Sequence, residues 1–386
     1  MIRSSSVAYI ILSLYAVFGL ALSAVPVISK LGFVFAFTGS IYMLSVYLRR
    51  RTPIPNFFIV VSAFFCFLLI SSIWSPISNY SAIGGILTVY FSCFFVISGL
   101  YLKIITPLGV VVIMTLPGLI NVIAYFLGIN YVTEIYDLSS DSAIKRFGGF
   151  IGHPNAMLTR MMLPLLIAAV IGDKLIESHF FNKVVFPIII LLGVFAVFSS
   201  GSKKALLFFV IALPLILAFY PMVRYRMALF FCISVIPMFI LFWYFSTVDL
   251  STSGVEVFVR ISNMFEGDES TKERYFMALM GLNLFSESPI FGHGLNSFSV
   301  MSGLGYYSHN NAVEILVSGG LLLFLCYYFV FFYSVLFSGI KVSWFYALGV
   351  LLLFIGFDST SVSFMDRGIH LVYCLFAMNF LVRKVA

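Results

Sequence analysis

Long apolar runs, separated by short polar segments, fill most of the 386-residue chain. A helix that crosses a bilayer needs about 20 mostly apolar residues. Runs that meet or approach this length lie at 7–25, 28–48, 57–74, 83–102, 107–128, 154–172, 184–199, 204–220, 227–247, 310–337, 342–358 and 366–382. The pattern predicts an all-α, polytopic integral membrane protein with about 12 transmembrane helices.

The composition supports this fold class. Hydrophobic residues make up 62% of the chain and charged residues only 10%, whereas a soluble domain carries about 25% charged residues. We therefore expect residues 1–386 to form a single transmembrane helical domain. The first apolar run is interpreted as a retained span, because no A-x-A-type cleavage site followed by a soluble domain is present.

The distribution of positive charge predicts an orientation. If the N-terminus is cytoplasmic, every predicted cytoplasmic segment carries at least one Lys or Arg, as the positive-inside rule requires. These residues are Arg3, Arg49, Arg50, Arg51, Lys103, Lys174, Lys183, Arg224, Arg226, Lys341, Arg383 and Lys384. Both termini are therefore predicted to be cytoplasmic.

One long segment, residues 248–309, has the composition of a soluble domain and includes the charged stretch “EGDESTKER” (266–274). It falls between the ninth and tenth predicted helices, and so on the outer side of the membrane. Because long loops in compact domains usually carry function, we expect this external loop, inserted in the helical domain, to contribute to a functional site.

Several basic residues fall on the predicted outer side, against the charge bias of the other loops. They are Lys145, Arg146, Lys203, Lys204, Arg260, Lys272 and Arg274. Arg offers phosphate oxygens a planar fork of donors and Lys offers a point charge, so this set suits a lipid-linked phosphate. Contact with lipid headgroups is the alternative interpretation.

Arg160 lies within the sixth predicted span, near its outer end. A charge at such depth costs at least about 2.5 kcal/mol unless it is paired or faces water. The side chain is interpreted as part of the wall of a polar cavity, or as one that extends to the membrane surface.

The stretch “YSHNNAVEILVSGG” (307–320) places polar residues directly before an apolar run. A neutral imidazole can take a proton from a hydroxyl near neutral pH, so His309 is a candidate catalytic base. Asn310 and Asn311 either orient sugar hydroxyls or cap the next helix, and Glu314 falls inside that helix. The alternative for the whole cluster is a helix cap without chemistry.

The remaining histidines and cysteines indicate no further site. The cysteines (Cys66, Cys93, Cys232, Cys326 and Cys374) lie in apolar runs without a CxxC pair, and are interpreted as small hydrophobic residues. His153, which precedes Pro154, and His293, in a glycine-rich turn, are interpreted as structural. Histidines spaced as i, i+4 pairs, an external DxD motif and nucleotide-binding glycine patterns are all missing. We expect no metal, no other cofactor and no nucleic-acid partner.

Several stretches of the sequence resemble one known family. They are “RFGGFIGHPNAMLTRMMLPLL” (146–166), “FSSGSKKALLFFVIALPL” (198–215), “KERYFMALMGLNLFSESPIFGHGLNSF” (272–298) and “YSHNNAVEILVSGGLLLFLCYY” (307–328). In this order, and with a large external loop before the last, they resemble the O-antigen ligase/polymerase family of bacterial membrane glycosyltransferases.

The resemblance implies a GT-C-like enzyme of the bacterial inner membrane whose active site faces the periplasm. It implies an undecaprenyl-pyrophosphate-linked oligosaccharide donor and a metal-independent transfer. By motif, Arg274 corresponds to the arginine at the pyrophosphate, His309 to the histidine that activates the acceptor hydroxyl, and Arg146 to the arginine before the HPN-type turn. The family's serine–arginine turn reads “SKK” (202–204) here, so either lysine takes the place of the arginine.

Within this family, a polymerase joins lipid-linked repeat units of O-antigen or capsular polysaccharide, and a ligase transfers the finished glycan to lipid A-core. “SGSKKALL” and “YSHNNAVEILVSGG” are more similar to the polymerase (Wzy-type) branch. Repeat-unit polymerisation is therefore the predicted function and ligation the alternative. A lipid-linked oligosaccharide flippase is disfavoured, because most spans lack mid-helix charges. The expected partners are membrane lipids and, from the same pathway, a chain-length regulator and a flippase.

Overall fold

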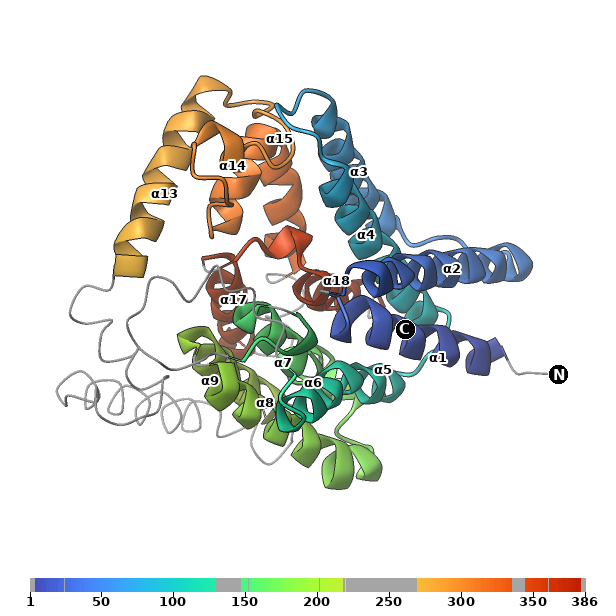
Figure 1. Ribbon diagram of the computed structural model, residues 1–386. Helices are drawn as coiled ribbons and strands as arrows, with labels where there is room; N and C mark the ends of the chain where they lie inside the picture. The colour runs from blue at the N-terminus through green and yellow to red at the C-terminus, as the bar shows by residue number, and fades with distance from the viewer. Residues whose placement is uncertain are drawn as a thin grey trace, which may run out of the picture. The chain divides into compact units, whose positions relative to one another are not determined.

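The computed structural model describes residues 4–23, 25–129, 147–151, 153–200, 202–217, 219, 269–334, 344–359 and 361–382. The regular secondary structure in these ranges is helical, and they contain no strand. This confirms the predicted all-α class for the part of the chain that is described. The helices gather into two compact units, Met1–Gly39 with Gly99–Gly267 and Ser40–Ser98 with Asp268–Ala386 (Figure 1).

Many of the helices are long and apolar enough to cross a membrane. Within the described residues these are Val27–Arg50, Tyr80–Tyr101, Pro107–Phe126, Pro154–Lys174, Phe181–Ser200 and Asn311–Phe329. Shorter apolar helices are Ser5–Ala21, Phe58–Ile73, Lys204–Leu217, Tyr346–Asp358 and Arg367–Met378. Each coincides with a predicted run, and the run at 227–247 lies outside the described residues. The chain is thus a multi-pass membrane protein, whereas the count of 12 spans and the orientation stay predictions.

The first unit is built around α7. It contains α1 (Ser4–Tyr15), the first part of α2 (Pro26–Arg50), α5 (Pro107–Met114), α6 (Leu116–Phe126), α7 (Pro154–Ile171), α8 (Phe186–Ser200) and α9 (Lys203–Leu217). α7 is buried along most of its length and packs against α5, α6, α8 and α9. Its start is capped by His153, whose Nδ1 accepts a hydrogen bond from the Asn155 N–H at 3.2 Å, with Pro154 at the first helical position.

The second unit is built around α15. It contains α3 (Asn56–Ile70), most of α4 (Tyr80–Tyr101), α13 (Glu269–Glu287), α14 (Phe298–Met301), α15 (Asn311–Ser334), α17 (Trp344–Asp358) and α18 (Arg367–Val382). α15 packs against α3, α13, α17 and α18 (Figure 1). The helix α13 lies within the predicted external loop, where the sequence indicated polar composition but no particular element.

A break in α15 joins it to the segment that follows α13. At Gly320 the backbone has φ 64° and ψ −164°, a conformation essentially restricted to glycine. The main-chain groups released around this break bond to the segment 289–294. The Val317 and Ser318 carbonyls accept from the N–H groups of His293 (2.7 Å) and Gly294 (2.9 Å), and Leu321 N–H donates to the Pro289 carbonyl (2.8 Å).

The same segment is also fixed to its other neighbours. His293 Nε2 lies 2.8 Å from the Leu284 carbonyl of α13. The Leu295 carbonyl accepts from Ser75 Oγ at 2.7 Å and from Asn79 Nδ2 at 3.0 Å, both in the connection between α3 and α4. The segment thus joins α13 to the region of α15 around Gly320, through the His293 side chain on one side and main-chain hydrogen bonds on the other.

Candidate active site

His309 ends the loop that leads into α15. Its φ is 55°, in the left-handed region that is uncommon for residues with a side chain. Such conformations persist only where the surroundings impose them, and they are concentrated at functional sites. The ring centroid of His309 lies 4.4 Å from that of Tyr307 and 6.3 Å from that of Tyr306. The imidazole is thus partly enclosed by aromatic side chains on its own loop.

Asn310 caps α15. Its Oδ1 accepts hydrogen bonds from the N–H groups of Ala312 at 3.0 Å and Val313 at 3.2 Å, and its carbonyl accepts from Ser308 Oγ at 2.9 Å. Of the two roles considered for Asn310, the described contacts are those of a helix cap. The cap fixes the backbone on the C-terminal side of His309.

Glu314 fixes the backbone on the other side. Its side chain is 1% exposed, and Oε2 accepts from the Ser308 N–H at 3.0 Å. Among the described residues no donor reaches Oε1, which is also buried. A buried acceptor without a partner is unfavourable, and such atoms often indicate a functional role. Glu314 therefore secures the peptide before His309 and keeps one acceptor available.

Arg274 is connected to this loop through its neighbour in sequence. Tyr306 donates a hydrogen bond from its hydroxyl to Oε1 of Glu273, at 2.5 Å. Arg274 follows Glu273 on α13 and is exposed. α13, α14 and α15 share an apolar core of Met277, Leu284, Phe298, Val313 and Val317. The turn of α13 that carries Arg274 and the loop that carries His309 are therefore both attached to this apolar core.

Asn311 points into the protein. It is fully buried, its Oδ1 accepts from the Phe364 N–H at 3.0 Å, and its Nδ2 donates to the Tyr328 hydroxyl at 3.3 Å. Tyr328 donates in turn to Oδ2 of Asp358 at 2.6 Å, and Ser363 Oγ donates to Oδ1. Sequence reasoning missed this network, although an acidic residue at the end of an apolar run was a usable signal.

Two of the predicted site residues in the first unit, Arg160 and Lys204, are buried. Arg160, in α7, is 6% exposed, and Lys204, in the first turn of α9, is 9% exposed. Lys204 Nζ lies 5.4 Å from the ring centroid of Phe208, within range of a cation–π interaction. The helices α7 and α9 pack against each other. The side chain of Lys203, and the whole of Arg146 and Arg260, lie outside the described residues.

The predicted site residues thus divide between the two units. Arg274, His309, Asn310, Asn311 and Glu314 belong to the second, within two packed helices and the loop between them. Arg160 and Lys204 belong to the first.

The sequence was compared with models of known protein families. Residues 188–328 match the model of the O-antigen ligase family. This match supports the family that the sequence motifs predicted. The matched stretch contains Lys204, Arg274, His309 and Glu314, whereas Arg160 precedes it. None of the curated proteins matches the chain.

The match to the O-antigen ligase family over this stretch supports a membrane glycosyltransferase-like role in O-antigen assembly. It also implies lipid-linked glycans as substrates. The match supports the family as a whole, without favouring its ligase or its polymerase branch.

Proposed function

We propose that the protein is a glycosyltransferase that polymerises undecaprenyl-pyrophosphate-linked repeat units at the periplasmic face of the bacterial inner membrane. The observation that carries the proposal is the loop at His309, which lies inside the family match. The loop holds an imidazole between a helix cap and a buried carboxylate, beside a helix that presents an exposed arginine. This combination supplies a base and a cation, the groups that the transfer requires.

In the proposed reaction, His309 removes the proton of an acceptor sugar hydroxyl. The resulting oxygen attacks the anomeric carbon of the donor glycan. The bond from that carbon to the pyrophosphate oxygen breaks, and its electron pair leaves with undecaprenyl pyrophosphate. Attack from the face opposite the leaving group inverts the anomeric configuration, which linkage analysis of the product can test.

Arg274 is proposed to stabilise the negative charge that develops on the leaving pyrophosphate. A guanidinium can donate two parallel hydrogen bonds to phosphate oxygens, which a lysine cannot. The proposal therefore predicts that Arg274→Lys loses much of the activity despite the retained charge. Arg146, Arg160, Lys203, Lys204 and Arg260 are proposed to add to the positive potential that attracts the lipid-linked donor.

The ladder of envelope glycans in a deletion strain tests this function. The strain is complemented with the wild type, with His309→Ala, or with the control His179→Ala, which alters an exposed histidine outside the family match. We expect the wild type and the control to restore the full ladder. His309→Ala should give core plus one repeat unit, at wild-type protein levels.

Other ladders contradict parts of the proposal. Loss of every band above the core in the deletion strain, with long glycans still on undecaprenyl lipid, identifies the ligase instead of the polymerase. If His309→Ala restores the full ladder, His309 is not the catalytic base and its role is that of a residue in the helix cap.

A further inference from the structure

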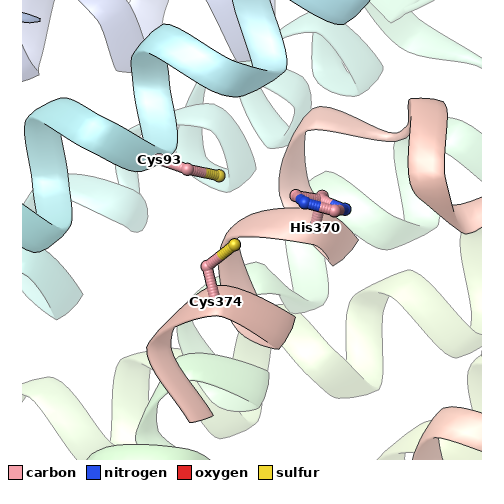
Figure 2. A group of neighbouring side chains, drawn as sticks. All are labelled: Cys93, His370 and Cys374. Carbon is pink, nitrogen blue, oxygen red and sulfur yellow. The ribbon is translucent and has the colours of Figure 1, made fainter. Parts of the chain in front are cut away.

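Two cysteines and a histidine meet in the interior of the second unit, outside the family match. Cys93 comes from α4, and His370 and Cys374 come from α18. The sulfur atoms and a ring nitrogen of His370 lie within 4.8 Å of one another, and all three residues are buried. Figure 2 shows both sulfur atoms and the imidazole directed toward a common region between the helices.

Sequence reasoning interpreted these cysteines as small hydrophobic residues, but the structure places them beside a histidine. The signal was present in the spacing of His370 and Cys374. Residues at i and i+4 lie on the same face of a helix, one turn apart. α18 therefore contributes two potential ligands, His370 and Cys374, to the same site, and α4 contributes the third, Cys93. A pair of ligands on one helix is a common arrangement at metal sites.

The imidazole has a fixed position but incomplete hydrogen bonding. Its ring packs against Phe65 at 5.1 Å, Tyr373 at 5.6 Å and Phe64 at 6.3 Å between centroids. It is 2% exposed, and its Nδ1 has no hydrogen-bond partner among the described residues. A buried polar nitrogen without a partner is rare in native proteins. A bond from this ring to a metal ion would account for a polar side chain in an aromatic environment.

The donors determine the class of ion. Thiolate and imidazole ligands favour copper and zinc over magnesium, calcium or manganese. Zn²⁺ with two thiolates would form a neutral complex, but zinc sites in proteins almost always have four ligands. In the part of the chain that the structure describes, no further His, Cys or carboxylate joins this cluster. The buried surroundings also leave little access for a water molecule as the fourth ligand.

We propose that Cys93, His370 and Cys374 bind one Cu(I) ion. The three soft or intermediate donors match the preference of Cu(I) for thiolates. The ion links α4 to α18, two helices that are far apart in the sequence. A ligand that binds only the folded state stabilises it, so Cu(I) should raise the unfolding temperature of the whole protein.

Titration of the full-length protein in detergent tests the site. Reduced, metal-free protein is titrated anaerobically with Cu(I) in competition with bicinchoninate, a chromophoric chelator. We expect one equivalent to bind. Cys93→Ser, Cys374→Ser and His370→Phe should each weaken binding by at least about tenfold. Loss of a group that only hydrogen-bonds to a metal ligand already weakens binding by about that factor. His370→Phe keeps an aromatic ring in the stack and removes the ligand.

The other cysteines supply matched controls. Cys66→Ser and Cys326→Ser alter described cysteines that are not in the cluster, and both variants should bind Cu(I) like the wild type. X-ray absorption of the copper-loaded wild type gives a measurement independent of any substitution. It should show two sulfur ligands and one nitrogen ligand.

Three results would overturn the proposal. The first is Cu(I) binding that is equal in the wild type and in the three cluster variants. The second is a preference of the same residues for Zn²⁺ over Cu(I), which would assign another ion. The third is a Cys93–Cys374 disulfide in the protein as isolated from cells, found by mass spectrometry of peptides from unreduced protein.

Discussion

At the scale of the residue, the structure shows a backbone conformation of His309 that its side-chain chemistry alone could not indicate. The side chain type suggested a base, but its backbone φ of 55° depends on contacts that Ser308, Asn310 and Glu314 make together. The sequence allowed two readings of Asn310, and the bonds to Ala312 and Val313 are those of a cap. It gave no reason to expect Asn311 to be buried among Tyr328 and Phe364.

Glu314 provides a prediction at this scale. Glu314→Ala removes the acceptor of the buried Ser308 N–H, which should cost about 1–3 kcal/mol of stability. Glu314→Gln keeps an oxygen at that position and should unfold close to the wild-type temperature. Thermal unfolding of the two variants in the same detergent makes the comparison. If Glu314→Gln lowers the unfolding temperature as much as Glu314→Ala does, an oxygen that accepts the Ser308 N–H is not sufficient, and the loop requires the carboxylate.

At the scale of the element, the apolar runs predicted the helices well because the length of a run is a local property. The run 310–337 gave no sign of the break at Gly320, since “SGG” within an apolar run is compatible with a continuous helix. The break requires the segment 289–294 to supply hydrogen-bond partners from elsewhere in the chain. α13 was missed for a related reason: its polar sequence indicated exposure, while its packing on α15 depends on a few apolar positions.

The break provides a prediction with an internal control. Gly320→Ala places a side chain where the backbone is nearly restricted to glycine and where the new Cβ would overlap the Ile290 carbonyl. We expect a loss of at least about 1–3 kcal/mol. Gly84→Ala, in α4, meets no atom within 4 Å and should be neutral or stabilising by about 0.5–1 kcal/mol. Equal unfolding temperatures for the two variants would show that the break is not required.

At the scale of the whole molecule, composition was sufficient to predict a multi-pass membrane protein, because a chain with 10% charged residues cannot form a soluble surface. The family resemblance followed from ordered motifs, and the match over 188–328 supports it. The meeting of Cys93 with His370 and Cys374 could not be predicted, since it depends on the packing of α4 and α18. The orientation of the spans stays a prediction.

Labelling from outside the cell tests that orientation. Lys272→Cys replaces an exposed residue of α13, in the predicted external loop. Arg50→Cys replaces an exposed residue at the predicted cytoplasmic end of α2. A membrane-impermeant maleimide applied to spheroplasts should modify the first variant and leave the second at the level of the unsubstituted protein. Labelling of Arg50→Cys alone would invert the orientation and place His309 on the cytoplasmic side.

The most direct test of the proposed function is a transfer reaction with purified protein and an undecaprenyl-pyrophosphate-linked repeat unit as sole substrate. We expect a lipid-linked product of two repeat units together with free undecaprenyl pyrophosphate. His309→Asn, whose side chain tolerates the left-handed backbone but cannot act as the base, should be slower by about 100-fold or more. Absence of the elongated product with the wild type would contradict the proposed polymerase activity, and equal rates for the two proteins would contradict the role of His309 as the base.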